Sequence, residues 1–279
     1  MPNDIIFDEI HVIESVKESD GDPGRQLVAR WNSTAQTIPM FGYFVFDRED
    51  LYETLAKIKA CTTDKGLVPL LHFEGHGSDY GFELRKQGEC ISWEEFGAIL
   101  WDFNRASGFN LFGAFSCCYG IRQLKTMTTS QPCPFSRVIG CDHKAFTAEL
   151  FEGFYSFYEV LVKTGSGKLA LEALTAQISS DARFSFIRAE DAFREVYRLV
   201  LEQYRSPGFI DEMRKRHLAA IESQPDLFRG KKISSADIDI AFAISDFMNL
   251  REFHERFFGC AEVPLNRTRF PLEKLIIGL

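Results

Sequence analysis

A histidine and a pair of cysteines occupy comparable places in this 279-residue sequence, each at or just after a short apolar run. His76 follows the run Leu67–Phe73, and Cys117 and Cys118 close the run Asn110–Cys118. A cysteine thiolate is a strong nucleophile, and a nearby imidazole both lowers the thiol pKa and can protonate a leaving amine. The two runs therefore predict nucleophilic chemistry on an acyl group, provided that the fold brings the thiol and the imidazole together.

Glycines flank the histidine on both sides. Because Gly75 and Gly77 have no β-carbon, we expect the chain to turn sharply there and to approach a substrate closely. The amides of Gly77 and Cys118 can then receive the oxyanion of a tetrahedral intermediate. Loss of one such donor typically lowers the rate by on the order of 10²-fold or more.

The elements that must position these groups alternate between strands and helices. The patterns predict strands at Asp4–Val16, Gly42–Phe46, Leu67–Phe73, Asn110–Cys118 and Phe135–Cys141, with helices capped by Asp47 and Ser92 and a further helix beginning near Lys144. This order is typical of a mostly parallel sheet covered by helices, whose reactive groups collect at the carboxyl ends of the strands. After about Ser180 only helical periodicity remains, so we expect an α/β domain over residues 1–180 and a helical region over residues 181–279.

The segments LLHFEGHGS and AFSCCYG resemble the two site motifs of the caspase-like cysteine peptidases, which include caspases, separases and, as the nearest group, bacterial CHAT-type proteases. The resemblance covers roughly Ile5 to Leu174 and implies a three-layer caspase-like fold. Cys118 matches the nucleophile of the C-x-G pattern, although Ser116 replaces the glutamine of the family signature. A motif that begins at Cys117 also fits, so Cys117 is the alternative nucleophile or a neighbour of the substrate.

The resemblance also implies how a substrate would be held. Asp142 is expected near the pocket for the P1 residue, where an acidic group favours a basic side chain, and Asp79 is a second acidic candidate. A helix cap is the competing explanation for Asp142. The family works with a Cys-His dyad, and the sequence offers no evident third member, so we expect neither a metal nor an organic cofactor.

Composition excludes several other functions. The chain has 32 Lys and Arg against 40 Asp and Glu, a net charge of -8 and no large basic cluster, which argues against a nucleic acid or a membrane as partner. A signal peptide and a long apolar run are both absent, so a cytoplasmic protein is expected. The seven cysteines are odd in number and include an adjacent pair, which does not suggest a disulfide framework. Cys133, Cys141 and His143 also lack the paired spacing of a structural zinc site.

These observations predict a cysteine endopeptidase that cleaves a protein or peptide substrate through an acyl-enzyme. By family analogy we expect it to serve a bacterial signalling or defence system, with a regulatory protein partner. Two alternatives remain open at this point. One is a catalytically inactive caspase-like module that engages a partner protein, and the other is an acyltransferase or a different hydrolase that uses the same dyad.

Overall fold

The computed structural model of the chain describes residues 6–122, 131–144, 147–178, 182–204 and 249–277, together with the single residues 208, 212 and 215. The chain divides into two compact units, Met1–Met127 with Pro132–Ala189, and Thr128–Gln131 with Glu190–Leu279. The first unit holds the sheet, and the second holds helices.

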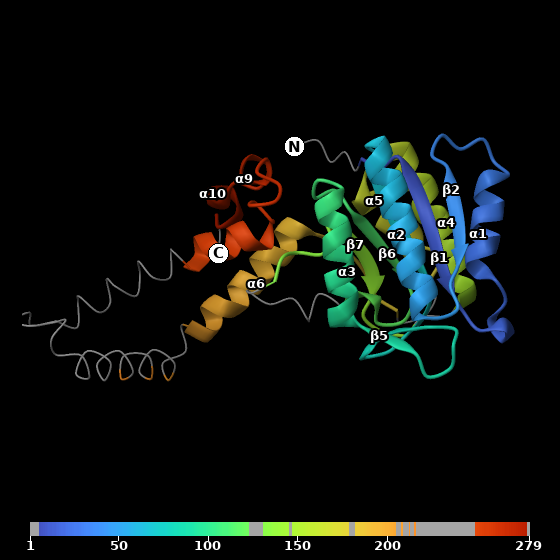
Figure 1. Cartoon of the computed structure of the whole chain (residues 1–279), viewed down its shortest axis with the longest axis horizontal. Helices are drawn as coiled ribbons and strands as arrows, with labels where there is room; N and C mark the ends of the chain where they lie inside the picture. The colour runs from blue at the N-terminus through green and yellow to red at the C-terminus, as the bar shows by residue number, and fades with distance from the viewer. Residues whose placement is uncertain are drawn as a thin grey trace, which may run out of the picture. The chain divides into compact units, whose positions relative to one another are not determined.

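A central sheet of eight strands organises the first unit, and six of them follow one another in the order β2-β1-β3-β6-β7-β8 (Figure 1). These six strands are β1 (Glu9–Ser15), β2 (Met40–Phe44), β3 (Pro69–Gly77), β6 (Phe112–Ser116), β7 (Arg137–Cys141) and β8 (Phe184–Arg188). Neighbours among them are parallel except for β7 and β8. The two short strands β4 (Gly81–Glu83) and β5 (Cys90–Ser92) form a hairpin against the end of β3. The predicted α/β fold with a mostly parallel central sheet is therefore confirmed.

Helices cover both faces of this sheet (Figure 1). One face carries α1 (Pro23–Asn32), α4 (Thr147–Thr164) and α5 (Gly167–Thr175); the other carries α2 (Arg48–Lys65) and α3 (Trp93–Ala106). The predicted caps are present: the Asp47 side chain accepts a hydrogen bond from Asp50 N (3.1 Å), and the Ser92 side chain accepts one from Glu95 N (3.2 Å). Each cap satisfies an amide that has no partner within its helix.

Alternate residues along the strands fill two separate cores. On the α4 face, Leu70 and Phe112 pack in one cluster with Trp31 and Tyr158. On the α3 face, the Phe73 and Phe115 rings stack 5.1 Å apart and Phe96 lies across both. Because both faces are buried, apolar residues lie on both faces of the strands, which explains why the runs in the sequence do not alternate between apolar and polar.

Three elements of this unit were not predicted. The helix α1 lies between the predicted strands Asp4–Val16 and Gly42–Phe46, where no element was expected, and the β4-β5 hairpin follows the site histidine. The strand β8 lies beyond the predicted end of the sheet, so the unit ends at Ala189 instead of Ser180. β8 has only five residues; it pairs antiparallel with β7, and its rings Phe184 and Phe186 contact Phe154 and Phe112.

The C-terminal unit has a core of phenylalanine side chains. Phe193 of α6 (Ala189–Tyr204) packs on Phe253, Phe257 and Phe258 of the later segment, whose residues 249–257 are helical. Two short helices follow, α9 (Asn266–Arg269) and α10 (Leu272–Leu275). The helix predicted over residues 209–222 lies outside the described residues, apart from residues 212 and 215. Of the helix predicted over residues 235–258, the structure describes residues 249–258, and residues 249–257 are helical.

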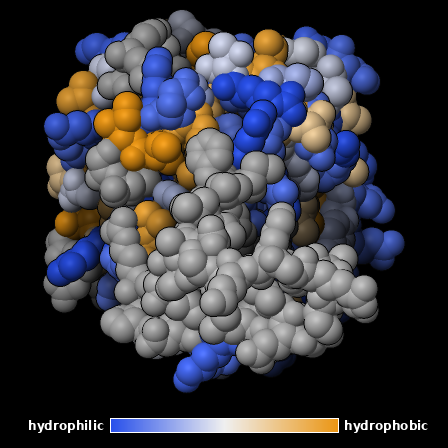
Figure 2. Space-filling view, turned by 90° about the vertical axis from the view of Figure 1, so that its left-hand side faces the viewer, coloured by the Kyte–Doolittle hydropathy of each residue, from blue (hydrophilic) through white to orange (hydrophobic). Residues whose placement is uncertain are grey.

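Some large apolar side chains of this unit remain exposed, among them Leu199, Leu265 and Ile277. The face in Figure 2 shows hydrophobic side chains in small groups among hydrophilic ones. Scattered exposed apolar residues of this kind are common on protein surfaces. No helix among the described residues is both long enough and apolar enough to cross a lipid bilayer.

Candidate active site

Neighbouring parallel strands bring the predicted nucleophile and base to one edge of the sheet. β3 and β6 pair in parallel, with Glu74 opposite Ser116. His76 lies two residues beyond that pair in β3, and Cys118 two residues beyond it after β6. Both residues therefore lie at the carboxyl edge, as the sequence predicts.

The chain segments that carry these two residues are in direct contact. A β-carbon at Gly77 would overlap the carbonyl oxygen of Cys118 and would lie 3.3 Å from the Cys117 sulfur. At Gly75 a β-carbon would lie 2.7 Å from the Phe82 ring. β3 runs on through both glycines, so the predicted sharp turn is absent, and the glycines are needed because there is no room for side chains.

The two adjacent cysteines have different surroundings. The Cys117 side chain is buried, and burial raises the pKa of its thiol well above the ordinary value. Cys118 is half-buried. The buried Cys141 thiol donates a hydrogen bond to the Cys117 carbonyl (3.2 Å), which adds to the packing around that residue. Since a desolvated thiol is a poor source of thiolate, Cys118 is the better nucleophile of the pair.

The sharp turn occurs on the cysteine side of the site. Tyr119, directly after Cys118, has a φ of 60°, which is uncommon for a residue with a side chain. Its amide donates a hydrogen bond to the His143 carbonyl (3.2 Å) and so connects the loop after β6 to the loop after β7. A β-carbon at Gly120 would overlap that of Phe115, so the chain needs a glycine to complete the turn.

A carboxylate that the sequence analysis missed contacts the histidine. Asp20 lies in the short 3-10 helix η1 (Glu18–Asp20) that follows β1, the other neighbour of β3. His76 Nε2 lies 2.7 Å from Asp20 Oδ2, and this hydrogen bond is the main reason that the pKa of Asp20 is lowered. With Nε2 bonded to a carboxylate, Nδ1 is the ring nitrogen left for the nucleophile. The only feature of the sequence that could have indicated Asp20 as a partner of His76 was its position shortly after the predicted strand Asp4–Val16.

The amide of Gly77 points away from the neighbouring hairpin. Ser78 N donates to Gly81 O (2.9 Å), so these two residues form a hydrogen-bonded pair in the β3-β4 ladder. Hydrogen-bonded and non-hydrogen-bonded pairs alternate, and Gly77 opposite Phe82 is therefore a non-hydrogen-bonded pair. This geometry suits the predicted role of the Gly77 amide as an oxyanion donor.

Buried polar side chains that precede His76 on the same face of β3 are connected by hydrogen bonds. His72 Nε2 contacts Glu74 Oε2 (3.2 Å), and His72 Nδ1 contacts the Tyr158 hydroxyl (2.7 Å). Ser116, opposite Glu74, is buried and its hydroxyl has no hydrogen-bond partner among the described residues. Both ring nitrogens of His72 therefore have hydrogen-bond partners, and His72 is a structural residue of the core.

Glu14 of β1 belongs to the same group of buried polar side chains, since it lies opposite Glu74 in the strand register. Its carboxylate accepts hydrogen bonds from Gly24 N (2.8 Å) and Arg25 N (3.2 Å) in the first turn of α1, where the helix dipole favours a negative charge. Burial is the largest influence on the pKa of Glu14 and raises it, and the nearby Glu74 adds to this effect.

The two acids predicted near the substrate each have a partner. Asp79 forms an ion pair with Arg122 (2.6 Å), whose guanidinium lies over the Tyr119 ring. Asp142 follows β7 and contacts the exposed His143. His143 and Lys144 are not helical, and α4 is described only from Thr147, so the alternative that Asp142 caps a helix starting near Lys144 is wrong.

No protein-family model matches the chain, and no curated protein matches its sequence.

Proposed function

We propose that the chain is a caspase-like cysteine endopeptidase in which Cys118 is the nucleophile and His76 is the general acid and base. The observation that carries this proposal is the contact of Gly77 with the Cys118 main chain across two neighbouring parallel strands. A thiol on a half-buried residue and an imidazole with a carboxylate partner then flank the same edge of the sheet.

In the first half of the reaction, His76 accepts the thiol proton and the Cys118 sulfur attacks the scissile carbonyl carbon. The amides of Gly77 and Cys118 hold the negative charge that develops on the carbonyl oxygen. The carbon–nitrogen bond breaks as His76 gives its proton to the leaving amine, which leaves a thioester on Cys118. Water, deprotonated by His76, then hydrolyses the thioester and restores the thiol.

Asp20 adds a third residue to the dyad of Cys118 and His76. As the acceptor from Nε2, Asp20 keeps the proton on that nitrogen and leaves Nδ1 to exchange a proton with Cys118. Its negative charge also stabilises the imidazolium that forms when the thiol ionises. Asp20 is a positioning residue, because it acts through His76 and not on the substrate.

The substrate in this proposal is a protein or peptide, and Asp142 favours a basic P1 residue. Asp142 is the better candidate of the two acids, because the carboxylate of Asp79 already pairs with the cation of Arg122. A cytoplasmic location, a role in bacterial signalling or defence and a regulatory partner remain part of the proposal. A reducing compartment suits an enzyme that needs its cysteine as a thiolate.

The test is N-terminal profiling of the products that the wild-type, Cys118→Ala and Cys117→Ala chains release from a proteome-derived peptide library. We expect new N-termini with the wild type and with Cys117→Ala, and none with Cys118→Ala. Loss of cleavage with Cys117→Ala alone would reverse the assignment of the nucleophile. No new N-termini from any chain, together with no labelling of Cys118 by a peptide electrophile, would favour the inactive binding module.

A further inference from the structure

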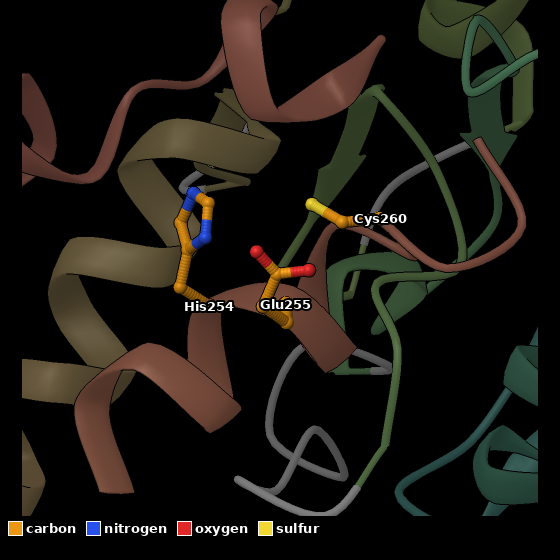
Figure 3. Close-up of side chains that lie close together, drawn as sticks. All are labelled: His254, Glu255 and Cys260. Atoms are coloured by element: carbon orange, nitrogen blue, oxygen red, sulfur yellow. The ribbon is translucent and has the colours of Figure 1, made fainter. Parts of the chain in front are cut away.

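A second group of reactive side chains lies in the C-terminal unit, in a stretch that the proposed peptidase function does not use. Figure 3 shows His254, Glu255 and Cys260 converging on one point. One ligand atom from each residue lies within 4.8 Å of the other two. His254 and Cys260 are buried, and Glu255 is half-buried. In the described part of the chain, these residues form a compact set of nitrogen, oxygen and sulfur donors.

The end of a helix creates this arrangement. Gly259 has a φ of 55°, and its amide donates to Arg256 O (3.0 Å), while Cys260 N donates to Glu255 O (2.8 Å). These two hydrogen bonds define a Schellman motif, which folds the chain back so that the residue after the glycine lies against the last helical turn. The two positions that meet in this motif are usually both apolar. Here they are a thiol and a carboxylate.

Contacts from outside the group hold two of the three side chains. His254 Nε2 lies 2.6 Å from the carbonyl oxygen of Phe270. Because a carbonyl can only accept, Nε2 carries the proton, and the lone pair of the neutral ring lies on Nδ1. Arg267 holds the Glu255 carboxylate through its Nε (2.9 Å to Oε1) and Nη2 (2.6 Å to Oε2). Metal-binding histidines and carboxylates are typically oriented in this way by carbonyls and hydrogen-bond donors.

We propose that His254, Glu255 and Cys260 bind a zinc ion, with water as the fourth ligand. Zinc accepts nitrogen, oxygen and sulfur together in a tetrahedral arrangement, whereas calcium and magnesium require oxygen ligands. Tetrahedral zinc holds its ligand atoms about 3.5 Å apart, so a pair of ligand atoms as far apart as 4.8 Å would have to approach by roughly 1 Å. The Cys260 thiol gives its proton to solvent as the sulfur–zinc bond forms. The ion would bind the end of helix 249–257 to the loop that follows it.

The experiment uses the full chain with the Cys118→Ala substitution, so that the peptidase thiol cannot supply a ligand. The metal-free protein is titrated with Co²⁺, whose bond to a thiolate produces a charge-transfer absorption, and then with Zn²⁺ as competitor. Zinc retained after gel filtration is counted by mass spectrometry. Added to this background, Cys260→Ser and His254→Gln are the test variants. Cys61→Ser, which alters an exposed cysteine, is the matched control.

We expect one equivalent of metal per chain and a thiolate absorption band that Zn²⁺ abolishes. Cys260→Ser should lose the band, His254→Gln should weaken metal binding about 100-fold or more, and Cys61→Ser should bind as the parent does. Zinc should raise the melting temperature of the parent but not that of Cys260→Ser, which guards against an effect of misfolding. Absence of bound metal in the parent, or equal binding by parent and both test variants, would overturn the proposal.

Discussion

Substitution of Gly77 by alanine tests the central contact of the proposed site. The added β-carbon would overlap the carbonyl oxygen of Cys118 and would lie 3.3 Å from the Cys117 sulfur. Neither neighbour is the flexible end of a long side chain, so the end of β3 and the cysteine loop must move apart. An ordinary carbon–oxygen contact needs about 3.3 Å, which requires a displacement on the order of 1 Å.

A displacement of this size should be costly for catalysis. Misplacement of reacting groups by about 1 Å can lower the rate by about 10²-fold, because the thiol, the imidazole and the oxyanion donors no longer converge. We therefore expect Gly77→Ala to reduce kcat/KM for a cleaved peptide by about 10²-fold. The rate at which iodoacetamide alkylates Cys118, resolved by mass spectrometry, should also fall, and this readout needs no known substrate.

Gly97→Ala is the matched control. Gly97 lies within α3, where an added β-carbon would have no neighbour within 4 Å. Alanine there should raise the free energy of unfolding by about 0.5–1 kcal/mol and leave alkylation of Cys118 unchanged. If Gly77→Ala matched the wild type in both alkylation rate and melting temperature, the contact between β3 and the cysteine loop would be refuted.

Two further predictions concern carboxylates. Asp20→Asn should lower kcat by about 10²-fold with little change in KM, because the imidazolium of His76 loses its charged partner. Asp20→Glu should restore part of kcat, and an unchanged kcat in Asp20→Asn would show that the carboxylate has no role. Burial raises the pKa of Glu14 in the folded chain above its ordinary value of 4.5, so folding favours the protonated acid. Its contribution to stability is complete below pH 4.5 and is lost as the pH rises through the folded-state pKa. In urea unfolding between about pH 4 and pH 8, the free energy of unfolding should therefore fall less in Glu14→Gln than in the wild type. The control Glu94→Gln, at an exposed residue, should behave as the wild type. Equal pH dependence in Glu14→Gln and the wild type would contradict this assignment.

The sequence was sufficient for the parallel part of the sheet. Runs such as Leu67–Phe73 are mainly apolar because helices cover both faces of the strands, and most are separated from the next by a segment of helical periodicity. β8 was missed because a strand of only five residues, paired with β7 and packed on rings distant in the sequence, has no clear pattern of its own. The helix α1 was missed because its first residues, Pro23 and Gly24, are more typical of turns.

In the candidate site, too, some residues could be predicted from the sequence and others could not. His76 and Cys118 were evident from sequence because each follows an apolar run, and parallel strands end at the same edge of a sheet. Asp20 was not, because it is 56 residues from His76 and meets it only through the order of the strands. The zinc ligands of the C-terminal unit were also missed, since their spacing fits no zinc motif and a helix-ending turn brings Cys260 back to Glu255.

The chain's pattern of residues alone indicated the parallel strands with most of the helices between them, and it indicated His76 and Cys118 as candidates for the chemistry, because local preference and burial leave a periodic pattern in consecutive residues. Only the tertiary structure distinguished the buried Cys117 from the half-buried Cys118, and only it replaced the expected turn at Gly75 and Gly77 by a strand with no room for side chains. The reason is physical: the solvation of a thiol and the space around a glycine are set by atoms from other strands, whose positions depend on how the whole sheet is packed.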